Sequence, residues 1–264
     1  MKELHYKYDN IFDFYKDALT FTKNGDIRRF NEYQDEDDPS FRGLSKEEIL
    51  KSKYNYQKGL DRLKELQLDI QVGGSKRNYK YDEFDGDDIN YDRLLDGFPP
   101  MRKRIKNHGV GSGRLVNIYV IVSENCDITS EELLYKANTA IQIVDMLENM
   151  GYRVAVYSCD ITEDSYGQYQ GEQNISYQLK ICVKKHEDSL NKGLILTSIS
   201  PWFFRYYMFI HQVGHYNPGG GLGHSVKLKE TESKETIIIN KGQCLNKMGA
   251  DKKINEIKNL FKAE

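Results

Sequence analysis

The segment that most constrains the fold is VNIYVIVSENCDITSEELLYKANTAIQIVDMLENMGYRVAVYSC, residues 116–159. Its nearly continuous apolar start predicts a strand buried on both faces. Thr129 and Glu132 then have the spacing of a capping box, and apolar side chains recur at helical spacing until Gly151, the expected end of the helix. Residues 153–157 predict the next strand. The segment is therefore a β-α-β unit, whose crossover we expect to be right-handed.

Later segments continue the alternation of strands and helices. The stretch ISYQLKICVK, residues 175–184, predicts an edge strand, and GLILTSIS, residues 193–200, predicts a further buried strand. Pro201 suits the first position of a following helix, and ETIIIN, residues 235–240, predicts the last strand. The C-terminal residues 251–264 predict an amphipathic helix. This spacing predicts an α/β fold, a three-layer, doubly wound domain with a mostly parallel sheet.

The N-terminal part of the chain has a different pattern, mainly helical with short strands. Ser45 and Glu48 have capping-box spacing and predict a helix whose apolar side chains continue through residues 49–66. Three glycines in NHGVGSGR mark the expected boundary. We therefore expect an N-terminal helical or mixed layer, residues 1–107, followed by the α/β domain, residues 108–264.

Composition excludes several classes of protein. The chain has 38 Lys and Arg residues against 40 Asp and Glu, so no global charge attracts it to nucleic acid or anionic lipid. Its four cysteines lie far apart without a C-x-x-C pair, which argues against a zinc ribbon and a dense disulfide framework. It has no apolar run near the roughly 20 residues of a membrane span, and no signal-peptide pattern. We expect a soluble, cytoplasmic protein without a cofactor or membrane partner.

The order of strands and helices resembles a von Willebrand factor A-type domain. In that family the turn after the first strand carries a D-x-S-x-S motif that coordinates a divalent metal. Here the matching residues are Ile121 to Asn125, so Ile121 stands at the first Asp and Asn125 at the second Ser. The later segment TSISP offers hydroxyls but no carboxylate, whereas Mg²⁺ binds through one or two carboxylates. The resemblance implies a retained scaffold with a degenerate metal site.

A second resemblance covers most of residues 41–210. The stretches FRGLSKEEIL, YQKGLDRL, YDEFDGDDINYDRLLDGFPPMR and SPWFFRYYMF together resemble an uncharacterised domain family known mainly from phages and other mobile elements. This resemblance implies a phage-type context, with the protein in the host cytoplasm or in the virion, and no established activity.

The first functional hypothesis is a non-enzymatic binding or assembly module. Ligands of open α/β sheets bind beyond the carboxyl ends of the strands. No nucleophile motif such as G-x-S-x-G occurs, so we assign no catalytic residue. We predict that a polar rim at that edge holds a protein partner, and that it consists of Ser123, Asn125, Asp127, Ser198 and Ser200.

The main alternative is a nucleic-acid-associated protein of phage replication or packaging. The segment MRKRIKNHGVGSGR carries five basic residues that could neutralise phosphates. Acidic stretches nearby, DEDD and DEFDGDD, could instead neutralise this segment within the fold. The candidate contacts are Arg102, Lys103, Arg104, Lys106 and Arg114.

The third hypothesis is a metal-dependent enzyme. His211 and His215 have the H-x-x-x-H spacing that places two imidazoles on one helical face, and His224 follows a glycine-rich loop. Gln212 stands where a zincin has its catalytic Glu. Gly214 and the following Asn and Pro also predict that the helix ends near His215, which would separate the two imidazoles.

Overall fold

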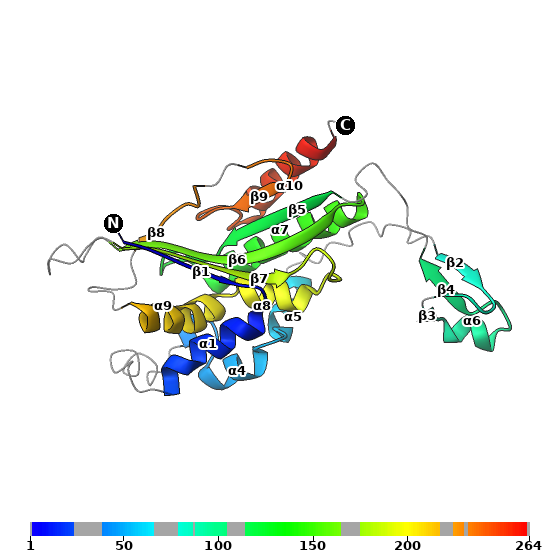
Figure 1. Cartoon of the computed structure of the whole chain (residues 1–264), viewed down its shortest axis with the longest axis horizontal. Coiled ribbons are helices and arrows are strands. Elements are labelled where there is room, and N and C mark those ends of the chain that lie inside the picture. The colour runs from blue at the N-terminus through cyan, green and yellow to red at the C-terminus, as the bar shows by residue number, and fades with distance from the viewer. Residues whose placement is uncertain are drawn as a thin grey trace.

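The structure is a computed structural model that describes residues 2–23, 39–65, 79–86, 88–104, 114–164, 175–216, 224–229 and 232–262. Its main sheet contains β1 (Lys2–Tyr8), β5 (Leu115–Ile121), β6 (Arg153–Asp164), β7 (Ile175–Lys184), β8 (His224–Ser225) and β9 (Thr236–Ile239). The strand order is β1-β7-β6-β5-β9, with β8 beside β6 (Figure 1). Strands β6, β5 and β9 are parallel, β7 is antiparallel to β6, and β1 is parallel to β7. The chain therefore has an α/β fold with a mostly parallel sheet, as predicted.

The helices that accompany this sheet lie on one of its faces. They are α1 (Ile11–Lys23), α3 (Pro39–Arg42), α4 (Lys46–Ser52), α5 (Gln57–Glu65), α7 (Ser130–Asn149), α8 (Lys192–Ile199), the π-helix η2 (Phe203–Met208), α9 (Phe209–His215) and α10 (Lys247–Lys262). In Figure 1, α1, α4, α8 and α9 lie together beneath the strands. Buried side chains from α1, α7, α8, α9 and α10 form one cluster with Ile118, Val156 and Leu179 of the sheet. No described helix has the length and apolar character needed to span a membrane.

The opposite face of the sheet differs from the prediction of three layers. Its buried cluster is small and includes Ile121, Ile161 and Ile238, with Leu228 from a loop packed over them. Among the described residues, no helix contributes to this cluster. Tyr119, whose side chain lies on this face, is partly exposed. Buried and partly exposed side chains therefore alternate along the strand, whereas a strand covered by helices on both faces is continuously apolar. In the described part of the chain the fold thus has two layers.

Strand β1 belongs to the central sheet. It pairs with β7 from Lys2↔Ile175 to Tyr8↔Ile181, so residues 175–184 form an inner strand and the predicted edge position was wrong. Phe14 of α1 and Ile49 of α4 belong to the same cluster as the sheet. The expected division into residues 1–107 and 108–264 therefore does not follow the hydrophobic core.

Two local predictions were also wrong. Residues 193–200, expected to form a strand, belong to helix α8, where the Asn191 side chain caps the start by accepting from the backbone NH of Leu194 at 3.0 Å. A short apolar run suits either structure, and here the buried Ile195 and Ile199 lie one helical turn apart. The helix predicted to run from Ser45 through residue 66 is instead divided into α4 and α5, with a break between them.

Both predicted capping boxes are present. The Thr129 hydroxyl accepts from the backbone NH of Glu132, and the Glu132 carboxylate accepts from the backbone NH of Thr129. Thr129→Ala should lower the free energy of unfolding by about 1 kcal/mol, because the first turn of α7 loses its cap. Urea denaturation measures this. Thr20→Ala, an exposed mid-helix change on α1, is the control and should stay within about 0.5 kcal/mol; equal losses would contradict the role of the cap.

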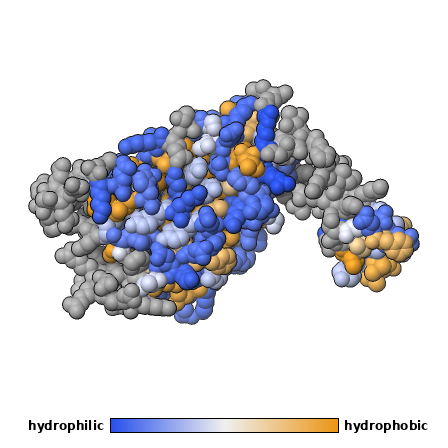
Figure 2. Space-filling view, in the orientation of Figure 1, coloured by the Kyte–Doolittle hydropathy of each residue, from blue (hydrophilic) through white to orange (hydrophobic). Residues whose placement is uncertain are grey.

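A separate small sheet contains β2 (Tyr79–Asp82), β3 (Asp88–Ile89) and β4 (Met101–Arg104), in the order β2-β4-β3, with helix α6 (Tyr91–Leu95). Several apolar side chains of this unit are exposed, among them Phe84 at 85% and Leu95 at 86%. Figure 2 shows apolar residues gathered on this unit.

Candidate metal centre

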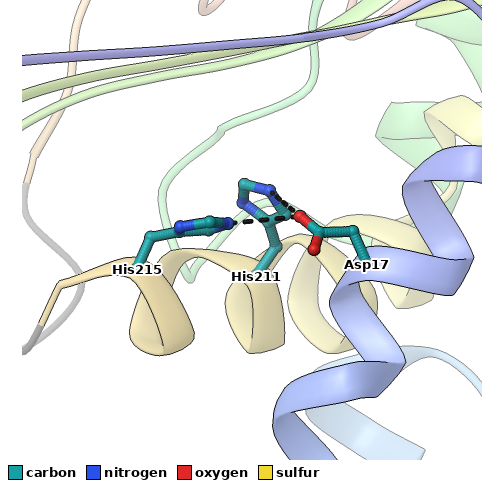
Figure 3. Close-up of side chains that lie close together, drawn as sticks. All are labelled: Asp17, His211 and His215. Atoms are coloured by element: carbon teal, nitrogen blue, oxygen red, sulfur yellow. Dashed lines mark hydrogen bonds and ion pairs between the residues drawn. The ribbon is translucent and has the colours of Figure 1, made fainter.

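Three side chains with metal-binding atoms come together between α1 and α9 (Figure 3). Asp17 extends from α1, and His211 and His215 extend from the same face of α9. Their nearest ligand atoms all lie within 4.8 Å of one another, and the two imidazole rings are 4.3 Å apart. Helix α9 ends at His215, as expected, but both histidines lie within it and share a face, so the expected separation of the two imidazoles was wrong. The H-x-x-x-H spacing thus brings the imidazoles of His211 and His215 together.

The distances between these atoms suit a bound cation. Asp17 Oδ2 lies 3.3 Å from His215 Nε2 and 3.5 Å from His211 Nε2. Hydrogen bonds between charged groups are shorter, about 2.7–2.9 Å. Two ligand atoms of a tetrahedral zinc ion, each about 2.0–2.1 Å from the metal, are about 3.3 Å apart. The two distances from Asp17 are therefore close to those between ligands of a tetrahedral metal ion.

Aromatic packing positions both helices. The ring of Phe14 on α1 lies 5.5 Å from Phe203 and 5.7 Å from His211, and both phenylalanines are buried. Phe203 begins the π-helix that leads directly into α9. Such π-helical turns are rare and frequent at functional sites. Asp17 follows Phe14 by three residues, so the helical repeat aims its carboxylate at α9.

Tyrosines from two strands surround the cluster. The Tyr8 hydroxyl of β1 donates to Asp17 Oδ2 and lies 2.7 Å from His211 Nε2. On the other side of the same imidazole, the Tyr177 hydroxyl of β7 lies 2.6 Å from Nδ1. The Tyr6 ring lies 4.1 Å from the ring of His215. His211 is thus held at both nitrogens, which fixes the orientation of its ring.

Electrostatics give the ligands the protonation states that a metal needs. Burial lowers the pKa of His211 to about 3; His215 adds to this effect and Asp17 opposes it. Burial raises the pKa of Asp17, but hydrogen bonds from Tyr8 and His215 outweigh it, so this pKa is lowered overall. At neutral pH the site therefore offers a neutral imidazole and a carboxylate, the forms that bind metal.

One side of the cluster is accessible to solvent. The side chain of His211 is fully buried, whereas those of Asp17 and His215 are 37% and 22% exposed. A cation could therefore reach the site, and a water or substrate could approach it from the side of Asp17 and His215.

Comparison with known proteins gives one match, which extends over residues 2–264. The matching sequence model is described as "Domain of unknown function (DUF7192)". The chain belongs to the DUF7192 family. No curated protein and no solved structure matches it. Nothing in these matches bears on a phage origin or on a von Willebrand A-like core, so both remain hypotheses.

Two of the three predicted histidines thus belong to the metal cluster of this DUF7192 chain. His224 lies in β8, opposite Glu163 of β6, and is exposed and outside the cluster. Asp17 was not predicted, because it lies far from the histidines in the sequence. One signal was available: Ile11, Phe14, Tyr15 and Ala18 form the apolar stripe of an amphipathic helix, and Asp17 interrupts it.

The residues of the predicted binding rim do not form one exposed surface. Ser123, Ser198 and Ser200 are buried. The Ser123 hydroxyl accepts from the backbone NH of Ile161 at 3.1 Å, and the other two hydroxyls donate to carbonyls within α8. Asn125 and Asp127 are exposed. The three serines are buried and hydrogen-bonded within the fold, so of the predicted rim only Asn125 and Asp127 have exposed side chains.

The predicted basic segment is described only in part. Arg102 lies in β4, opposite Tyr81 and Asp88, and Arg114 is exposed just before β5. Lys106 and the side chains of Lys103 and Arg104 lie outside the described part of the chain. Binding of nucleic acid or of a protein partner therefore remains a proposal.

Proposed function

We propose that this DUF7192 protein is a metal-dependent enzyme whose centre consists of Asp17, His211 and His215. The observation that carries the proposal is the position of Asp17 Oδ2, 3.3 Å from His215 Nε2 and 3.5 Å from His211 Nε2, since these distances fit ligands of one tetrahedral ion better than charged hydrogen bonds. Two imidazoles and one carboxylate suit zinc and neighbouring first-row transition metals.

The number of ligands favours a catalytic site over a structural one. Structural zinc sites use four protein ligands, whereas catalytic sites use three and leave a position for water or substrate. Among the residues that the structure describes, three such side chains converge here, and two of them are partly exposed. A metal held there would supply a bound water with a pKa lowered to about 7, and so a nucleophile at neutral pH.

The residues of the chain have distinct roles in this proposal. Buried His211 anchors the ion, and Asp17 contributes negative charge from the neighbouring helix. Partly exposed His215 completes the set, and the Tyr6 ring beside it forms a wall of the open side. A metal-bound hydroxide can attack phosphoryl, acyl and amide centres, so the proposed reaction class is metal-assisted hydrolysis.

Metal analysis tests the proposal. The chain, made without a histidine tag, is incubated with Zn²⁺, dialysed and measured by plasma mass spectrometry; about one ion per chain is expected. His215→Ala should weaken Zn²⁺ binding by about 100-fold or more, because loss of outer partners alone costs 10- to 100-fold. His215 suits this test because it is partly exposed, so its removal disturbs the core least.

His224→Ala is the matched control, because it removes an exposed histidine outside the cluster. This variant should keep the affinity of the wild type. A wild-type chain without Zn²⁺, or equal binding by the His215 and His224 variants, would overturn the proposal.

A further inference from the structure

The small sheet of β2, β3 and β4 with helix α6 lacks a buried core of its own. None of its described residues is buried, and none belongs to either hydrophobic cluster of the main sheet. A unit of fewer than roughly 40 residues usually needs disulfides, a metal or association with another chain to be stable. Residues 79–104 contain neither cysteine nor histidine, so a disulfide and a zinc site of the usual ligands are excluded. Association with another surface remains.

Helix α6 and the turn after it carry an exposed apolar stripe. Its side chains have the i, i+3, i+4, i+7 spacing that normally faces a core, yet each is between 50% and 86% exposed; they are Tyr91, Leu94, Leu95 and Phe98. The turn holds them together, because Gly97 has φ 75° and the backbone NH of Phe98 donates to the carbonyl oxygen of Arg93 at 2.9 Å. Apolar residues are visible across this unit in Figure 2. Apolar surfaces of this kind mark sites that contact a protein or a membrane.

The exposed charges of the unit are acidic. Among its described residues, the charged side chains that are exposed are Glu83, Asp85 and Asp96. The guanidinium of Arg93 is only partly exposed, since it lies 4.1 Å from the ring centre of Tyr81 and its Nε donates to the carbonyl oxygen of Pro99 at 3.2 Å. Like charges across an interface repel, so a partner that buries the stripe must be basic. An anionic membrane or a second copy of this surface would be repelled instead.

We propose that the stripe of α6 is a docking surface for an amphipathic helix of another protein, with apolar residues on one face and lysine or arginine beside them. Such helices bind through apolar residues at the same i, i+3, i+4, i+7 spacing. Leu95 and the rings of Tyr91 and Phe98 are the anchors of this contact. The bound helix would supply the apolar surface that the unit lacks. The inference does not depend on the proposed metal centre.

A synthetic helix of leucine and lysine is the probe, and its binding to the full chain is measured by titration calorimetry. The expected result is binding, with about 10-fold weaker binding of a matched peptide that has glutamate in place of each lysine. Hydrogen exchange of β2 and β4 should slow when the lysine peptide is bound, because the unit then gains buried apolar contacts. Absence of binding, or equal binding of the two peptides, would overturn the proposal.

Two variants locate the binding surface. Leu95→Ser should weaken binding of the lysine peptide about 10-fold or more, because Leu95 is the most exposed residue of the stripe. Met248→Ser is the matched control, since Met248 is 80% exposed but lies on α10, and it should keep the affinity of the wild type. Equal affinities of the two variants would also overturn the proposal. The comparison of the two peptides uses the wild type alone, so it holds even if Leu95→Ser unfolds the unit.

Two further measurements examine other occupants of the stripe. Vesicles of phosphatidylcholine and phosphatidylserine that bind the wild type but not Leu95→Ser would identify a membrane as the occupant. Dimers that sedimentation detects in the wild type but not in Leu95→Ser would identify a second copy of the chain. Either result would overturn the docking of a basic helix, whereas a monomer that ignores the vesicles and binds the lysine peptide supports it.

Discussion

Glu124→Gln is expected to lower the free energy of unfolding by about 3–5 kcal/mol, because it leaves a buried lysine without its counter-charge. Glu124 and Lys136 form an ion pair whose side chains are 2% and 0% exposed. Lys136 Nζ also donates to the carbonyl oxygens of Ile121 at 2.9 Å and Asn240 at 3.1 Å. Both carboxylate oxygens of Glu124 accept from the backbone NH of Gly242. The pair therefore joins the turn after β5, helix α7 and the loop after β9.

Urea denaturation measures this loss, and Glu131→Gln is the matched control. Glu131 pairs with Arg62 at 3.2 Å, but the two side chains are 48% and 47% exposed, so this change should cost no more than about 1 kcal/mol. Adding Lys136→Met to Glu124→Gln should recover much of the loss, because the uncompensated charge is removed. Similar losses for the two glutamate variants would contradict the assignment of Glu124–Lys136 as a structural pair.

The same ion pair occupies the carboxylate of Glu124. This residue lies in the turn after β5, where the resembled family coordinates a metal. In the structure, both carboxylate oxygens of Glu124 are already bound by protein groups, and the residue is buried. A protein cation thus satisfies this carboxylate, and the proposed metal ligands lie elsewhere, between α1 and α9.

Local signals predicted much of the fold. The β-α-β unit, both capping boxes, β9 and α10 follow from hydrophobic periodicity and from side chains that cap their own helix. These signals depend only on residues a few positions apart, so they can be recognised in a single sequence. The run at residues 193–200 was misassigned because strand and helix both accept a short apolar run, and packing decides between them.

Non-local pairing could not be predicted in the same way. Strand β1 reads KELHYKY and has few aliphatic residues, since its outward side chains are polar or charged and its inward ones include Tyr6 and Tyr8. Its place in the sheet depends on β7, far along the chain. The candidate site also depends on non-local contacts. The histidine pair was visible as a spacing, whereas Asp17, Tyr6 and Tyr8 reach it through the docking of β1 and α1, and Tyr177 reaches it from β7.

We expect the contribution of Asp160 to the stability of the metal-free protein to fall as the pH rises from about 4 to 7, and we expect Asp160→Asn to remove most of this pH dependence. Burial raises the pKa of Asp160 to about 7, against an ordinary value of 3.8, and the Ser123 hydroxyl lowers it slightly. The folded state therefore holds this proton up to higher pH than the unfolded state does. Stability from this group is fully present below about pH 4 and is lost as the pH rises to about 7. A shift of roughly three units corresponds to a loss on the order of 4 kcal/mol.

The measurement compares urea denaturation of Asp160→Asn and wild type at pH 4.5 and pH 8, with a chelator present. Groups that titrate equally in both proteins cancel in the difference, so the variant should gain stability relative to the wild type as the pH rises. Asp251→Asn, on the exposed surface of α10, is the control, and its difference from wild type should change by less than about 0.5 kcal/mol. A constant difference for Asp160→Asn would mean that burial does not raise the pKa of this carboxyl group.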